Sequence, residues 1–92
     1  MYLHIGGSAV VRKADVVAVC DLDNASQSRI TRDFLRRAEA AGCVINAAED
    51  LPKSCVICSG PDGAQRVYLS QLMSSTLLKR LDAPLGENLM DN

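Results

Sequence analysis

The sequence predicts an α+β domain, with a small mixed or antiparallel sheet of five to six short strands, one main helix and a short C-terminal helix. Short runs of β-branched and aliphatic residues recur between turn signals, and one longer segment shows helical periodicity. The chain has 92 residues, which suffice for one domain and are too few for two. We assign that domain to residues 1–82 and expect a flexible C-terminal tail over residues 83–92.

Turn signals separate the expected strands. Gly6-Gly7-Ser8 joins the first two strands as a hairpin, and Gly60-Pro61-Asp62-Gly63 joins the last two. Val16–Cys20 is a continuous apolar run, which is typical of a buried strand. The strands are expected at residues 2–5, 9–12, 16–20, 44–45, 54–59 and 65–70.

The main helix is expected from Ser26 to Ala41, where Gly42 ends it. An apolar stripe at helical spacing should face the core, and it consists of Ile30, Phe34, Ala38 and Ala41, with Leu35 on its edge. A second, short helix is expected over residues 76–81. Ser74 or Ser75 would cap it, although a helix N-terminus of this kind can also hold phosphate.

Three arginines, Arg29, Arg32 and Arg36, lie opposite the apolar stripe, on the outward face of the main helix. A row of this kind is either a solvated surface or a binding surface, and the pattern alone leaves both interpretations open. Asp33 stands four residues before Arg37 and can pair with it.

Composition limits the classes of function. The chain has ten basic and eleven acidic residues and therefore no excess of positive charge, so nucleic-acid binding requires local clusters of Lys and Arg. No signal peptide or membrane-spanning run is visible, and we expect a soluble, cytoplasmic protein that does not bind membranes. His4 and the glycine pairs belong to no catalytic constellation or nucleotide fingerprint. This favours a protein that is not an enzyme and takes no cofactor or small-molecule substrate.

Cys55 and Cys58 form a C-x-x-C motif, but two strong strand formers separate them. Because side chains alternate along a strand, these two residues should point to opposite faces and cannot converge on one zinc ion. Cys20 and Cys43 lack partners at metal-ligand spacing. We expect free, reduced cysteines that pack as small apolar residues.

A divalent-cation site is a weaker alternative. Asp21 and Asp23, together with Glu49 and Asp50, supply carboxylates, but such sites need more converging oxygen ligands. Capping by Asp23 and Asn24 explains the first pair more simply. We therefore expect no metal.

The strands carry more apolar surface than the helices can cover. Residues 16–20 and 55–58 are apolar on both faces of a pleated strand. Two helices, one of them very short, cannot cover both sides of the sheet. Some apolar sheet surface should therefore meet another subunit, and we expect a homo-oligomer.

Four segments carry a family resemblance: MYLHIGG…VVR, VVAVCDLDN…SRITRDFLRRAE, VINAAEDLPKSCVI and RVYLSQLMSSTLLKR. Together they resemble the Rem-type extracellular matrix (biofilm) regulators of bacteria, the B-type branch in particular, from Met1 to about Arg80. The resemblance implies a LytTR-like fold and a non-enzymatic, DNA-binding transcriptional regulator of matrix genes. From the A-type branch it further implies a ring that binds double-stranded DNA along a basic rim.

The chain departs from the A-type pattern at two places. In the A-type branch, the loop before the central strand carries paired arginines, whereas the corresponding Leu51-Pro52-Lys53 has a single charge. Before the strand that starts at Val16, Asp15 stands where that branch has a basic residue. The alternative to a DNA-binding homo-oligomer is an oligomeric scaffold that binds proteins without direct DNA contact. The candidate DNA-binding residues are Arg12, Lys13, Arg29, Arg32, Arg36, Lys53, Lys79 and Arg80.

Overall fold

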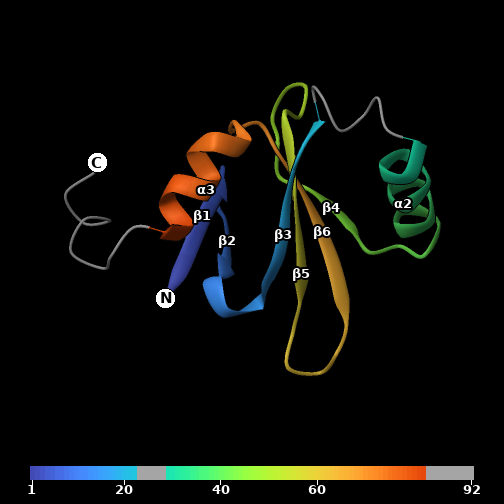
Figure 1. The fold of residues 1–92 in the computed structure, drawn as a ribbon, viewed down its shortest axis with the longest axis horizontal. Helices are drawn as coiled ribbons and strands as arrows, with labels where there is room; N and C mark the ends of the chain where they lie inside the picture. Colours follow the sequence, from blue (N-terminus) through green and yellow to red (C-terminus); the bar gives the residue numbers. More distant parts are fainter. Residues whose placement is uncertain (23–28, 83–92) are drawn as a thin grey trace.

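The computed structural model describes residues 1–22 and 29–82 (Figure 1). In chain order, the elements of these ranges are β1 (Tyr2–Gly6), β2 (Ala9–Arg12), the 3-10 turn η1 (Lys13–Asp15), β3 (Val16–Asp21), α2 (Arg29–Ala40), β4 (Val44–Asn46), β5 (Ser54–Ser59), β6 (Gln65–Ser70) and α3 (Ser74–Asp82). They confirm the α+β class predicted from the sequence.

The strands of the described ranges divide between two sheets. β1 and β2 form an antiparallel hairpin, and the other four strands lie in the order β3-β5-β6-β4. β5 is antiparallel to both β3 and β6, whereas β4 runs parallel to β6 at the edge. Both predicted hairpins are confirmed. The mixed sheet has four strands because the first hairpin packs on its face and does not extend it.

The β1–β2 hairpin and α3 cover one face of the four-stranded sheet. Leu3 and Ile5 alternate inward along β1 and meet Leu77 of α3 and Val56 of the sheet. The buried hydroxyl of Ser70, at the end of β6, donates a hydrogen bond of 2.5 Å to the carbonyl oxygen of Ile5. Apolar contact and this hydrogen bond together hold the hairpin on the sheet.

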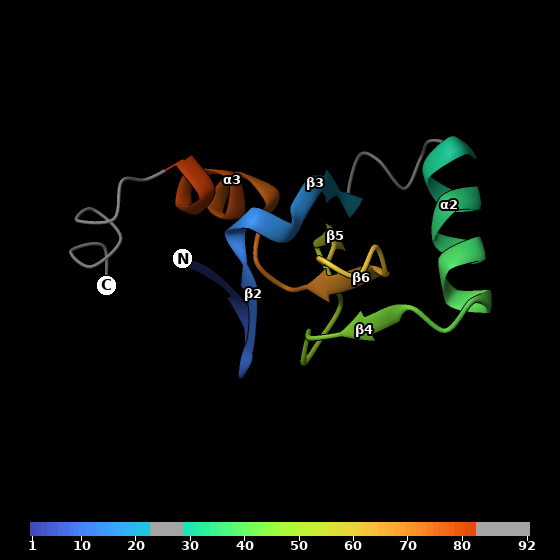
Figure 2. The same cartoon turned by 90° about the horizontal axis from the view of Figure 1, so that it is seen from below.

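α2 covers the opposite face of the sheet. Ala38 is buried against Cys55 and Val67, and Phe34 and Leu35 pack on the same cluster. Figure 2 shows α2 and α3 on opposite sides of the strands. The described residues therefore form three layers: the hairpin with α3, the four-stranded sheet, and α2.

The predicted apolar stripe of the main helix is wrong at its ends. Ile30 is 79% exposed and Ala41 is exposed as well, whereas Phe34, Leu35 and Ala38 face the sheet. The helix is oriented so that Ala38 is its buried residue, and a small side chain at this position lets a helix pack near the strands. Leu35, expected on the edge, is thereby brought into the contact.

The C-terminal helix begins earlier than predicted. α3 starts at Ser74, and the N–H of Leu77 donates to the carbonyl oxygen of Met73 at 3.1 Å, which gives Met73 the N-cap position. Ser74 and Ser75 are therefore residues of the first turn and not caps. Leu77 is consequently directed into the core.

Some expectations concern residues outside the described ranges. These are the first residues of the main helix, Ser26 to Ser28, the capping residues Asp23 and Asn24, and the C-terminal tail over residues 83–92.

Candidate nucleic-acid interface

Three arginines of α2 form an exposed row. Arg29, Arg32 and Arg36 are all exposed, on the side of the helix away from buried Ala38, as the helical periodicity predicted. Oδ1 of Asp33 lies 3.7 Å from Nη1 of Arg36, and both side chains are at least half exposed. Such a surface ion pair contributes little to stability. The guanidinium group can therefore exchange this carboxylate for a phosphate, to which it can form two hydrogen bonds.

The predicted pairing of Asp33 with Arg37 is wrong. Nε of Arg37 donates to the main-chain carbonyl oxygen of Asp33 at 3.4 Å, and the Asp33 carboxylate pairs with Arg36. The sequence offers an acceptable partner at both the i+3 and the i+4 position, and helix geometry alone does not choose between them.

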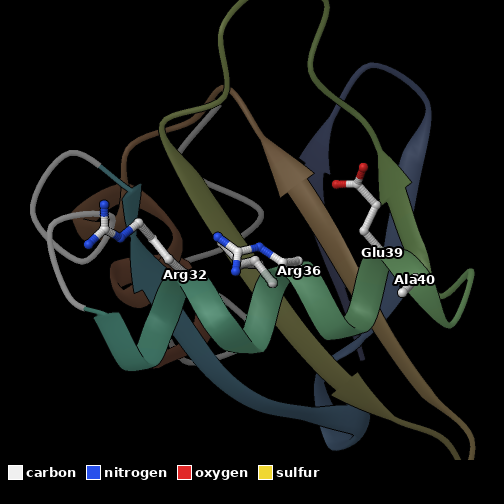
Figure 3. A pocket seen from close by; sticks show the side chains of 5 residues that line it. Arg32, Arg36, Glu39 and Ala40 are labelled. Atoms are coloured by element: carbon white, nitrogen blue, oxygen red, sulfur yellow. The ribbon is translucent and has the colours of Figure 1, made fainter.

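A shallow, open hollow of about 650 Å³ lies beside the row (Figure 3). Its lining includes Arg32 and Arg36, whose side chains lie along the same side of α2, and Glu39 one turn further along the helix. Leu35 and Ala40 complete the lining. Two guanidinium groups attract a phosphate, whereas the Glu39 carboxylate repels one. The hollow is therefore better suited to an anion toward the N-terminal end of α2.

A second basic group joins η1 to α3. Nζ of Lys13 donates to the carbonyl oxygen of Arg80 at 2.9 Å, and Nη1 of Arg80 donates to the carbonyl oxygen of His4 at 3.2 Å. Both cationic side chains are half-buried, and their hydrogen bonds connect the hairpin to α3. Arg12 and Lys79, their neighbours in the sequence, are the exposed cations of this group.

Lys53 lies in the segment that leads into β5, and its side chain is exposed. Its N–H donates to the carbonyl oxygen of Ser70 at 2.8 Å, and its own carbonyl oxygen accepts from the N–H of Leu22 at 3.0 Å. These two hydrogen bonds connect Lys53 to the ends of β3 and β6. The main chain therefore holds this single cation at the end of the sheet.

The predicted cations do not form one surface in a single chain. Arg29, Arg32 and Arg36 project from α2 on one side of the four-stranded sheet, whereas Lys13 and Arg80 lie with the hairpin and α3 on the other side (Figure 2). A single chain therefore presents two basic groups that face away from each other.

Two further arginines, Arg37 and Arg66, are exposed but are not among the candidate DNA-binding residues predicted from the sequence. Arg66 stands opposite Cys58 in the β5–β6 register, while its neighbour Val67 is buried toward α2. The alternation of buried and exposed residues along β6 is the signal that could have identified it. Arg66 therefore lies on the side of the sheet that the hairpin covers.

The cysteine prediction is confirmed in its geometry. Cys55 belongs to the cluster under α2 and Cys58 to the cluster under the hairpin, on opposite faces of β5. Burial, reinforced by neighbouring Cys20, raises the pKa of Cys55 to about 12. Burial and neighbouring Asp15 raise the pKa of Cys58, and Arg66 opposes them. Both thiols therefore stay protonated at neutral pH, whereas metal binding requires the thiolate.

Neither a metal-binding group nor a membrane-spanning helix occurs in the described residues. Within residues 1–22 and 29–82, no three His, Cys, Asp or Glu side chains come together in a group that could hold a metal ion. Among the helices of the same ranges, none is long and apolar enough to cross a membrane.

The fold and its exposed cations define a small α+β protein with a candidate nucleic-acid interface. The chain belongs to the RemA-like family, because the sequence model of that family, which is described as extracellular matrix regulatory protein A-like, matches residues 2–81. It is similar to extracellular matrix regulatory protein B of Bacillus subtilis (strain 168), with 36% identity over 80 residues. That alignment covers 87% of this chain and 89% of the relative. The family resemblance and the likeness to the B-type branch are thus confirmed.

Proposed function

We propose that this protein is a transcriptional regulator of extracellular-matrix genes that binds double-stranded DNA as a homo-oligomer and has no enzymatic activity. Membership of a family of extracellular matrix regulatory proteins supports the biological role. The observation that carries DNA binding is the row of Arg29, Arg32 and Arg36, exposed on α2 and directed away from the core.

Assembly into a homo-oligomer makes a short row of arginines sufficient for DNA binding. The chain has ten basic and eleven acidic residues, so a single subunit attracts DNA only locally. A closed homo-oligomer repeats the α2 row at fixed spacing, and the weak phosphate contacts of its subunits then act together. Arginine and lysine contacts of this kind fix a protein on the DNA backbone and carry little sequence information.

The test is DNA affinity as a function of salt concentration. Replacing Arg29, Arg32 and Arg36 together with Ala should weaken binding to all DNA sequences alike, because the arginines bind phosphates. The slope of log K against log salt should become less negative by about 0.9 for each phosphate that an engaged subunit no longer neutralises. The circular dichroism spectrum and the oligomer size should stay unchanged, since these side chains lie outside the core.

A matched pair of single variants distinguishes position from charge. Arg32→Ala and Arg66→Ala each remove one exposed arginine, but Arg66 lies on the hairpin side of the sheet. The α2 model requires that Arg32→Ala weakens binding more than Arg66→Ala does. Lys53→Ala tests the end of the sheet in the same assay. Equal affinities for the wild type and all these variants would overturn the assignment of the interface to α2.

A second candidate function is that of an oligomeric scaffold that binds proteins. Three large apolar side chains favour it: Val17, Ile30 and Leu51 are 66%, 79% and 81% exposed. Exposed apolar side chains on several elements are typical of surfaces that meet other proteins. Absence of any DNA binding by the wild type at about 50 mM salt, where phosphate contacts are strong, would replace the first function with this one.

A further inference from the structure

Cys20 and Cys55 face each other across two paired strands. In the antiparallel register of β3 and β5, Cys20 is the direct partner of Cys55. Both side chains belong to the cluster beneath α2, so they lie on the same face of the sheet. Cys55 is fully buried, whereas Cys20 is only partly covered. One thiol of the pair is therefore more accessible than the other.

The strand geometry nearly matches that of a disulfide. Directly opposed residues of an antiparallel pair have Cα atoms about 4.5–5.5 Å apart, within the range that a disulfide spans. The hydrogen bond from the N–H of Leu22 to the carbonyl oxygen of Lys53 shows that Cys20 and Cys55 occupy a hydrogen-bonded site, because such sites alternate along the ladder. Cβ atoms are further apart at such sites, so a disulfide there is strained and easily reduced.

No other pair of the four cysteines fits. Cys58 lies on the opposite face of β5. Cys43 immediately precedes β4, and β6 lies between β4 and β5, so two strand spacings, roughly 10 Å, separate Cys43 from Cys55. A disulfide requires Cα atoms within about 7 Å. The topology therefore selects one pair.

We propose that Cys20 and Cys55 form a redox-active dithiol, which small disulfides of the glutathione type oxidise reversibly to a cross-strand disulfide. The Cys20 thiolate, the more accessible group, attacks one sulfur of the oxidised small disulfide and releases one small thiol. Cys55 then loses its proton and attacks the Cys20 sulfur of this mixed disulfide, which releases the second small thiol. The protein loses two protons and two electrons, and the small disulfide takes them up as two thiols.

The position of the bond gives it a structural consequence. The cluster that holds Cys20 and Cys55 also receives Phe34 and Leu35 of α2. The disulfide therefore fixes the β3–β5 pair directly beneath the helix that carries the arginine row. We also expect the attack of Cys55 on the mixed disulfide to be the slow step of the reaction. Burial raises the pKa of the Cys55 thiol and thereby reduces its thiolate fraction.

The test uses the full chain equilibrated with glutathione buffers of increasing oxidised-to-reduced ratio, then acid-quenched, alkylated and digested with trypsin. We expect the peptide of residues 14–29 joined to that of residues 54–66, with fragment ions that place the bond at Cys55 and not at Cys58. The intact mass should fall by about 2 Da, since two hydrogens leave, and dithiothreitol should restore it.

Two serine variants complete the experiment. Cys20→Ser should abolish the mass change, whereas Cys43→Ser, which replaces another partly covered cysteine, should oxidise as the wild type does. Absence of the joined peptide at the most oxidising ratio would overturn the proposal. So would a bond that involves Cys43 or Cys58, or one between two chains.

Discussion

Ser70 shows how much depends on one buried hydroxyl. Its Oγ donates to the carbonyl oxygen of Ile5 and accepts from the N–H of Leu72, so it connects the hairpin, the end of β6 and the segment before α3. Ser70→Ala leaves both main-chain groups without this partner, and the free energy of unfolding should fall by about 1–3 kcal/mol. Ser59→Ala, at an exposed position of β5, is the control and should change it by less than about 0.5 kcal/mol. Urea denaturation measures both, and equal effects would contradict the structural role of Ser70.

The Cys55 thiol makes stability depend on alkaline pH. Burial, with neighbouring Cys20, raises its pKa from 9.0 to about 12 in the folded chain. Below pH 9 both states hold the proton; between pH 9 and 12 the unfolded chain loses it and the folded chain keeps it. Stability must therefore fall as pH rises through this window, by at most about 1.4 kcal/mol per pH unit. Urea denaturation in the presence of a reductant should show a flatter pH dependence for Cys55→Ala, and identical slopes would contradict the raised pKa.

At the scale of the element, α3 provides a test of helix orientation. Leu77 is fully buried against Leu3, Ile5 and Val56, whereas its neighbour Leu78 is 48% exposed. Leu77→Ala should lower the free energy of unfolding by about 2–5 kcal/mol, because it leaves a cavity between hairpin and sheet. Leu78→Ala makes the same chemical change at an exposed position of the same helix and should cost less than about 1 kcal/mol. If chemical denaturation gave the reverse order, α3 would be rolled differently from the structure.

At the scale of the whole molecule, the sheet leaves apolar side chains exposed on both of its edge strands. Val17 of β3 and Ile45 of β4 are 66% and 41% exposed, and within the described ranges β3 and β4 are the edge strands. We expect light scattering at micromolar concentration to give a mass several times that of the 9.9 kDa chain. Val17→Lys should reduce that mass, because it places a charge in an apolar contact, and Ser59→Lys should not. A wild-type monomer would contradict the expected assembly.

Much of the local structure could be predicted because short-range periodicity determines it. Turn residues between β-prone runs predicted both hairpins, and the period of two in β5 placed Cys55 and Cys58 on opposite faces. The helical period likewise placed the arginines of α2 opposite Ala38. The exact roll of that helix was not predicted, since Ile30 is as apolar as the residues that reach the core but meets no strand. The choice between Arg36 and Arg37 as partner of Asp33 depended on rotamers that the sequence does not specify.

The sequence by itself determined which residues share a face, because backbone geometry repeats every two residues in a strand and every 3.6 in a helix. Only the tertiary structure decided what each face meets. It placed the first hairpin on the sheet and not beside it, set β4 parallel to β6, and separated the α2 arginines from Lys13 and Arg80. It also brought Cys20 opposite Cys55. These arrangements bring together residues that are far apart in the chain. The free energy that selects them comes from the burial of apolar surfaces against one another, and no periodic pattern in the local sequence shows which surfaces will meet.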